Sequence, residues 1–248
     1  MKSINLTQTR VTWHAPESTP IPPSQKTHLA TVTGPINRIL LGERTALNIL
    51  ARASGIASKS ASLVSALRAA GWNGILAATR KTTPGFRVIE KYAVLVGGAD
   101  PHRHDLSTMI MLKDNHVWAC ANNAAAGGKG VESTAAAIPK AVSAAKAVGG
   151  FATKVEVEVC SVEEANVAID AGADVIMLDN FTPEGVRVAA KQLKEDWAGK
   201  RKFLVEVSGG LNESNAASFA CPDVDILSTS SIHQGVGIVD FSLKVSLR

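Results

Sequence analysis

The sequence predicts an α/β fold of parallel strands joined by crossover helices, with an α/β barrel as the natural candidate. Three observations lead to this class. Short β-favouring runs alternate with alanine-rich helical segments, the alternation has the spacing of strand–helix–strand units, and most runs end in polar or charged residues. Polar groups at the carboxyl ends of parallel strands are typical of barrel enzymes. The pattern alone leaves a doubly wound open sheet as the alternative.

The first 71 residues are predicted to hold two strands followed by two helical stretches. Residues 11–13 and 29–32 favour β-structure, and a proline-rich segment separates them. A helical pattern begins at Gly42, and a second helical stretch covers 58–70 and ends at Gly71.

The rest of the chain carries the alternation itself. Strands are predicted over 75–79, 109–113, 155–159, 175–179, 203–207 and 225–228. Helical composition covers 131–148, 162–171, 183–197 and 213–219.

Composition excludes several classes of protein. The 248 residues are 46% hydrophobic and 19% charged, which indicates a packed globular chain and excludes a disordered tail, a collagen and a coiled coil. The three cysteines are too few and too scattered for a disulfide scaffold or a zinc site, so we expect a cytoplasmic protein, with a nuclear pool left open. No signal peptide or membrane span is predicted, and the 4% of aromatic residues supply no stacking platform for nucleic acid. We therefore expect neither a membrane nor a nucleic acid as partner.

The run 154–159 is the most informative strand. Lys154, Glu156 and Glu158 alternate with three valines, so in a barrel the charges would face the lumen and the valines the helices. Buried charges of this kind must be paired or must serve a charged ligand, whereas a solvated edge strand is the alternative. The same alternation places Lys113, Asp179 and Ser208 near the carboxyl ends of their strands.

Two glycine-rich or serine-rich loops follow the last two strands. Ser208, Gly209 and Gly210 precede a helical stretch that we expect to begin near Asn212, and residues 228–231 follow the next strand. Glycines let backbone N–H groups approach a phosphate, and paired loops after the last strands form phosphate sites in barrels.

Cations crowd into the first half of the chain, where Arg80, Lys81, Arg103 and Lys113 stand at or near predicted strand ends. Such a cluster predicts a polyanionic substrate, since arginine forks suit carboxylates and phosphates. Arg44, Arg87 and Lys91 also fit solvated helix faces. His102 and His104 lack a carboxylate or cysteine at a familiar ligand spacing, so we do not expect them to be a metal pair.

These motifs resemble the quinolinate phosphoribosyltransferase family, and the resemblance extends from about Val11 to the end of the chain. It is carried by TRKTTPGFRVIEKYAVLVGG, HRHDLSTMIMLKDNH, KVEVEV, GADVIMLDN, VEVSGGL and STSSIHQG. The last of these and HRHDLSTM have the character of eukaryotic, fungal-like members. The resemblance implies an open or incomplete α/β barrel over 50–239 and an α/β sandwich remnant over 1–49, to which 240–248 return. Members usually carry a further amino-terminal region, so we expect a truncated sandwich.

The resemblance also implies a reaction, its cofactor and its residues. Quinolinate and phosphoribosyl pyrophosphate would react with Mg²⁺ to give nicotinate mononucleotide, pyrophosphate and CO₂, a step of NAD biosynthesis. Lys81, Lys113, Glu158 and Asp179 would be catalytic, with the two carboxylates near the ribose and holding Mg²⁺ through water. The implied substrate-binding residues are Arg44, Thr79, Arg80, Lys81, His102, Arg103, Lys113, Glu158, Asp179, Ser208, Gly209, Gly210, Ser231 and His233.

Arg44 would reach the site of a neighbouring subunit in a homodimer or hexamer. The proton that replaces the lost carboxylate would come from Lys81, from Lys113 or from a held water, which the sequence does not decide. Three alternatives stay open. They are a truncated non-catalytic or regulatory subunit of the same fold, a different phosphate-binding barrel lyase or isomerase, and a paralogue associated with molybdenum transport.

Overall fold

A six-stranded parallel sheet is the centre of the fold in the computed structural model, which describes residues 9–23, 25–121 and 133–246. The strand order is β3-β8-β7-β6-β5-β4. The strands are β3 (Ile75–Ala77), β4 (Ile110–Leu112), β5 (Val155–Val159), β6 (Val175–Asp179), β7 (Leu204–Ser208) and β8 (Ile226–Ser228). All six predicted strands are therefore present, with β3, β4 and β8 shortened by one or two residues and β7 shifted by one.

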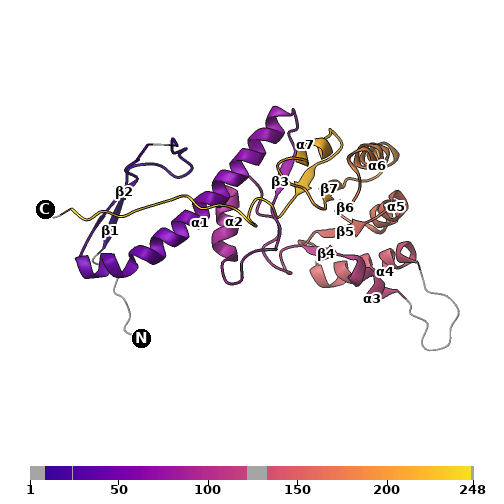
Figure 1. Ribbon diagram of the computed structural model, residues 1–248. Helices are drawn as coiled ribbons and strands as arrows, with labels where there is room; N and C mark the ends of the chain where they lie inside the picture. Colours follow the sequence, from indigo (N-terminus) through magenta and orange to yellow (C-terminus); the bar gives the residue numbers. More distant parts are fainter. Residues whose placement is uncertain (1–8, 24, 122–132, 247–248) are drawn as a thin grey trace.

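Helices α4 (Thr134–Gly149), α5 (Val162–Ala171) and α6 (Pro183–Asp196) pack on one side of this sheet (Figure 1). Each begins at a residue whose side-chain oxygen accepts a backbone N–H three residues later, namely Ser133, Ser161 and Thr182. Such caps satisfy amide groups that have no partner inside the helix. Val131, where the first of these helices was predicted to begin, lies outside the described residues.

The sheet is open, because β3 and β4 are its two edges and do not pair with each other in the described parts of the chain. The segment before His102 lies against β3 through an isolated parallel bridge between Ala77 and Asp100. Helices α1 (Ile36–Ala69) and α2 (Arg87–Val96) pack together, and α1 also contacts the short helix after β7, which in turn contacts α6, so the layer of helices continues around the sheet (Figure 1). The short helices α3 (Asp114–Cys120) and α7 (Ala216–Phe219) complete the fold. The predicted α/β fold with an open barrel is thus confirmed.

Helix α1 corrects the expectation of two separate helical stretches. It is continuous over 34 residues, so the helical pattern that begins at Gly42 and the stretch over 58–70 belong to one helix with no break between them. Gly55 is needed for packing and does not end a helix, since a Cβ atom there would lie 1.9 Å from the carbonyl oxygen of Gly237. The carboxyl-terminal segment crosses α1 at this glycine, where the N–H of Val239 donates to the carbonyl of Ala51 (3.2 Å).

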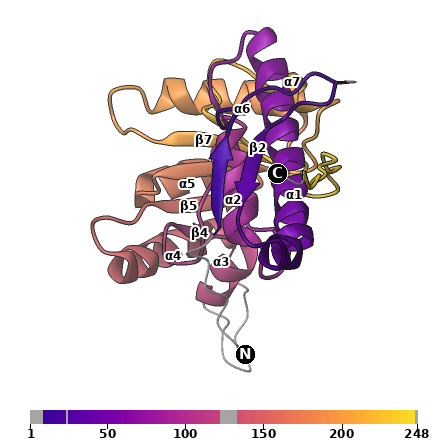
Figure 2. The ribbon, with the colours of Figure 1, turned by 90° about the vertical axis from the view of Figure 1, so that its left-hand side faces the viewer.

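Strands β1 (Arg10–Trp13) and β2 (Ala30–Thr33) form an antiparallel pair at the end of the molecule away from the large sheet (Figures 1 and 2). The last described residues run back along α1 towards this pair (Figure 1). The predicted boundary at 49/50 lies within α1, and the division into two domains stays a prediction.

The inner strand β5 has the predicted alternation. Its three valines are fully buried in the hydrophobic core, and the strand lies between β4 and β6, which excludes a solvated edge strand. Lys154 departs from the expectation, because it precedes the strand and is exposed. Among the residues that the structure describes, no helix combines the length and the apolar character that crossing a lipid bilayer requires.

Candidate active site

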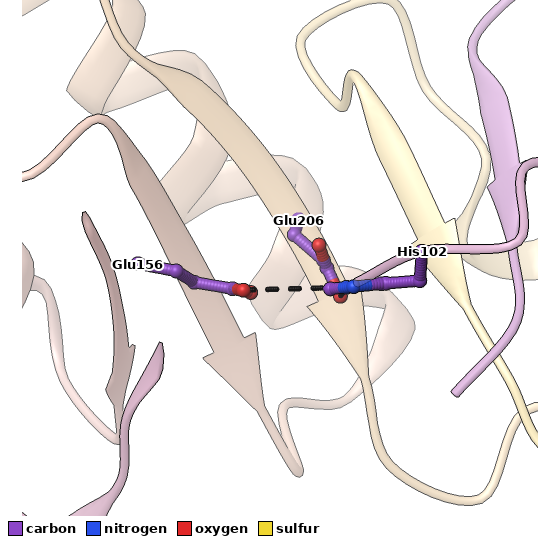
Figure 3. A group of neighbouring side chains, drawn as sticks. All are labelled: His102, Glu156 and Glu206. Carbon is purple, nitrogen blue, oxygen red and sulfur yellow. Dashed lines mark hydrogen bonds and ion pairs between the residues drawn. The ribbon is translucent and has the colours of Figure 1, made fainter. Parts of the chain in front are cut away.

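A buried cluster of His102, Glu156 and Glu206 lies inside the barrel (Figure 3). Glu156 comes from β5 and Glu206 from β7, and both are at most 1% exposed. His102 enters from the loop before β4 with a positive φ of 57°, and the Asp100 carboxylate holds its backbone N–H (2.6 Å). Burial, and then the neighbouring Glu206, raise the pKa of Glu156 well above its usual range.

The hydrogen bonds of His102 define its tautomer. The backbone N–H of Arg103 donates to Nδ1 (2.7 Å), so Nε2 carries the proton and donates to Oε1 of Glu206 (3.2 Å). The ligand atoms of the three residues lie within 4.8 Å of one another, as metal ligands do. Nε2 would have to lose its proton to bind an ion, so a hydrogen-bonded imidazole–carboxyl cluster describes the arrangement better. His104 lies apart from it and faces Asp105.

Lys113, Glu158 and Asp179 meet at the carboxyl ends of β4, β5 and β6. The Lys113 ammonium and the Glu158 carboxylate form an ion pair, and Glu158 is only 12% exposed. Asp179 is close enough to be affected by both, since burial and then Glu158 raise its pKa while Lys113 and Lys81 oppose that rise. These are three of the four predicted catalytic residues, and Lys81 acts electrostatically on the same carboxylate.

Cations gather beside this group. Burial, and then Arg80, lower the pKa of Arg103, whose guanidinium donates to the carbonyl of Met109 (3.4 Å). Arg80 keeps a buried Nε with no hydrogen-bond partner among the described residues. Lys91 corrects the expectation of a solvated helix face, because it is 4% exposed and donates to the carbonyl of Pro101. Burial, and then Arg87, lower its pKa to about 8.

The loop after β7 approaches the end of β6 very closely. Asp179 pairs with Ser208, and the N–H of Asn180 donates to the carbonyl of Ser208 (3.3 Å). Gly209 (φ +106°) has no room for a side chain, because a Cβ atom would lie 2.6 Å from Oδ1 of Asn180. The helix expected near Asn212 is reduced to the four residues of α7, so its dipole adds little to anion binding by this loop.

The loop after β8, the second loop predicted to bind phosphate, is hydrogen-bonded to the loop after β7. Thr229 Oγ1 accepts the N–H of Ser231 (3.0 Å) and donates to the carbonyl of Leu211 (2.5 Å). His233 is 1% exposed, and its Nε2 accepts the Thr79 hydroxyl (3.1 Å). Burial lowers the pKa of His233 to about 4. A cavity of about 300 Å³ lies here, with Lys81, Thr82 and His233 in its wall.

Arg44 is the predicted site residue that the structure does not bring to this place. It is exposed on the amino-terminal part of α1, which extends away from the large sheet (Figure 1).

Sequence reasoning did not count four charged residues near the site among its candidate site residues. Glu156 and Glu206 share a strand face with predicted residues, so the same alternation carried a signal for them. Arg52 and Glu90 form an ion pair (3.0 Å) between α1 and α2 that lines the cavity. Their spacing along the chain carries no signal, because only the tertiary fold brings them together.

The fold and the site define an anion-binding α/β-barrel protein, with cations and glycine-containing loops gathered at the carboxyl ends of its strands. The family descriptions "Quinolinate phosphoribosyl transferase, N-terminal domain" and "C-terminal domain" match residues 3–54 and 56–244. The chain belongs to the quinolinate phosphoribosyltransferase family.

Individual relatives agree with this assignment. The chain is 46% identical over 236 residues to the nicotinate-nucleotide pyrophosphorylase (carboxylating) of Homo sapiens, covering 95% of this chain and 73% of that one. A probable enzyme of the same name from Archaeoglobus fulgidus is 43% identical, with 86% and 75% covered. The solved nicotinate-nucleotide pyrophosphorylase from Francisella tularensis has a TM-score of 0.77 at 31% identity, with 94% and 74% covered.

Proposed function

We propose that the chain transfers the phosphoribosyl group of phosphoribosyl pyrophosphate to quinolinate with loss of CO₂, giving nicotinate mononucleotide and pyrophosphate. The observation that carries this proposal is the cluster of Arg80, Arg103 and Lys113 at the carboxyl ends of the strands, beside the carboxylates Glu158 and Asp179. The two substrates together carry roughly six to seven negative charges near neutral pH, which a cation cluster of this kind offsets. No observation favours a regulatory subunit, another barrel lyase or a molybdenum-linked paralogue.

The proposed residues divide the chemistry between them. Arg80, His102 and Arg103 bind the quinolinate carboxylates, and Lys113 neutralises charge next to them. The ring nitrogen forms a bond to C1′ of the ribose as the C1′–O bond breaks and pyrophosphate departs with the electron pair. Glu158 or Asp179 stabilises the positive charge that develops on the ribose.

Decarboxylation follows on the alkylated ring. The bond between C2 and its carboxylate breaks, CO₂ leaves, and the electron pair stays on C2 because the pyridinium nitrogen stabilises it. A proton from Lys81, Lys113 or a held water then completes the product. Ser208, Gly209, Gly210 and Ser231 bind phosphate oxygens in this proposal, and Thr79 supports His233.

Glu158 and Asp179 also fit a Mg²⁺ site. Their carboxylates are near enough for Glu158 to raise the pKa of Asp179, and they lie where a pyrophosphate would face Lys81. Mg²⁺ is commonly held by one or two carboxylates together with substrate phosphates and water. Bound there through water, the ion would supply positive charge opposite the pyrophosphate.

The proposal includes a homodimer or hexamer in which Arg44 completes the site of a neighbouring subunit. Its support is the exposure of Arg44 on the amino-terminal part of α1, which extends away from the large sheet. A cytoplasmic location is also proposed, because Cys120, Cys160 and Cys221 are all unpaired.

The test measures nicotinate mononucleotide formed from quinolinate, phosphoribosyl pyrophosphate and Mg²⁺ by the purified chain. We expect Arg80→Ala to lower kcat/KM by about 100-fold or more, the loss typical of one essential charge contact. Lys191→Ala, on the exposed face of α6, is the control and should match the parent. Equal activity of parent and Arg80→Ala would refute the assigned role, and a folded parent that forms no product would refute the function.

A further inference from the structure

Glu90 is a buried carboxylate that holds one wall of the cavity. It lies on α2 and is 1% exposed. Its oxygens accept the Thr83 hydroxyl (2.7 Å), the Thr83 N–H (3.2 Å) and the guanidinium of Arg52 (3.0 Å). These hydrogen bonds outweigh burial and lower the pKa of Glu90, so it is a carboxylate at neutral pH. Glu90 thereby fixes the end of the loop that carries Arg80 and Lys81.

Arg52, on α1, joins Glu90 to the second loop. Its Nη2 donates to the carbonyl of His233 (2.6 Å) as well as to Glu90, and its Nη1 donates to the carbonyl of Val236 (3.1 Å). A separate hydrogen bond from the Gln234 amide to the carbonyl of Lys81 (2.9 Å) links the same two loops.

The pair also faces the imidazole of His233. The backbone N–H of Thr79 donates to Nε2 of His233 (3.4 Å), so the Thr79 hydroxyl, which accepts the N–H of Lys81 (3.0 Å) and lies 3.1 Å from Nε2, must donate to the same atom. Nε2 is therefore unprotonated, and the ring proton lies on Nδ1. Nδ1 has no hydrogen-bond partner among the described residues, and the nearest charge is Oε2 of Glu90 at 3.9 Å. The Glu90 carboxylate thus favours the tautomer that lets Nε2 accept from the Thr79 loop.

We propose that Arg52 and Glu90 are a positioning pair that holds the 79–83 loop and the 231–236 loop at the separation at which Lys81 and His233 line one cavity. The inference rests on the proposed function, because it concerns how that reaction is oriented. Each loop can still bind its own part of the substrates without the pair. What the pair supplies is their relative placement, on which transfer between two bound substrates depends steeply.

The kinetic test compares Glu90→Gln, Arg52→Met and the double variant with the parent. Glutamine has the size of glutamate, but its single carbonyl oxygen can replace only one of the two carboxylate oxygens, so its NH2 group must face either the Thr83 N–H or the Arg52 guanidinium. We expect kcat to fall about 100-fold in all three variants, with KM for each substrate within about threefold of the parent. Glu213→Gln is the matched control. It breaks an exposed ion pair with Lys59 that also joins α1 to a loop, and it should keep the parent kcat.

Melting temperature separates positioning from mere stability. Arg52→Met leaves the Glu90 charge buried without its partner, whereas the double variant removes both charges. The double variant should therefore melt closer to the parent than Arg52→Met does, while its kcat stays low. A kcat that recovers together with the melting temperature, or a Glu90→Gln variant with parental kcat, would overturn the proposal.

Nitrogen-15 NMR of the six histidines provides a readout that needs no activity. The signal lost in His233→Gln identifies this ring, which should show a protonated Nδ1 in the parent and a mixture of tautomers in Glu90→Gln. Unchanged His233 signals in Glu90→Gln would contradict the positioning role. If the parent forms no product, the proposed function fails, and these spectra still decide whether the pair positions the loop.

Discussion

Gly209 provides the sharpest test of the geometry of the loop after β7, which we propose binds phosphate. Its φ of +106° strains any other residue, and a Cβ atom would lie 2.6 Å from Oδ1 and 3.0 Å from N of Asn180. The adjacent Gly210 also has a positive φ, +65°, but a Cβ atom there would meet nothing within 4 Å. The two glycines thus separate backbone strain from lack of space at neighbouring positions.

Gly210→Ala should destabilise the protein by about 1 kcal/mol, the cost of a left-handed alanine. In Gly209→Ala a similar backbone strain is joined by the clash of the new Cβ atom with the packed backbone of Asn180. We therefore expect this variant to be destabilised by about 3 kcal/mol. Urea unfolding at pH 7.5 measures both values. Because the displaced loop carries proposed phosphate contacts, KM for phosphoribosyl pyrophosphate should rise about tenfold or more in Gly209→Ala and less than threefold in Gly210→Ala. Equal losses in the two variants, in stability and in KM, would refute the close approach of this loop to Asn180.

Three further predictions address the remaining parts of the site. Burial lowers the pKa of His233 from 6.5 to about 4, so the unfolded chain binds a proton that the folded chain does not, and stability falls as the pH drops between these values. Urea unfolding at pH 7.5 and pH 4.5 measures how much the free energy of unfolding drops on acidification. This drop should be about 2–3 kcal/mol smaller in His233→Gln than in the parent, and equal drops would contradict the buried neutral ring. Asp179→Asn should raise the Mg²⁺ concentration for half-maximal activity by about tenfold or more, as a titration of activity with Mg²⁺ would measure, and an unchanged titration would remove Asp179 from the metal site. Finally, Arg44→Ala and Lys81→Ala should each be inactive alone, but mixing them should restore part of the activity, because some sites then combine an intact Arg44 from one subunit with an intact Lys81 from the other. No recovery after subunit exchange would reject a shared site.

The alternation of side chains along the strands made much of the site predictable. Glu158 and Ser208 were assigned to the inner face from parity alone, and the structure places both at the carboxyl ends of their strands. The same parity covered Glu156 and Glu206, whose burial together with His102 was not predicted. A strand pattern tells which face a residue occupies, but it does not tell which side chains meet across a barrel.

Glycine and helix-forming composition were less informative. Gly55 permits a close backbone approach in the middle of α1, and the two helical stretches expected from the sequence are one long helix. The segment 213–219 has helical composition, yet the side chain of Asn212 accepts the N–H of Ser214 (2.9 Å), and that of Asn215 accepts the N–H of Asn212 (2.8 Å). These local hydrogen bonds replace the first helical turn. The Arg52–Glu90 pair depends on contacts between distant segments and had no local signature.

The stoichiometry of a single reaction tests the central claim most directly. Quinolinate labelled in its 2-carboxylate is incubated with phosphoribosyl pyrophosphate, Mg²⁺ and the purified chain, and three products are counted. We expect labelled CO₂, pyrophosphate and nicotinate mononucleotide in equal amounts, and no CO₂ when phosphoribosyl pyrophosphate is left out. A folded chain that releases no CO₂, or that forms the mononucleotide only when nicotinate replaces quinolinate, would contradict the account.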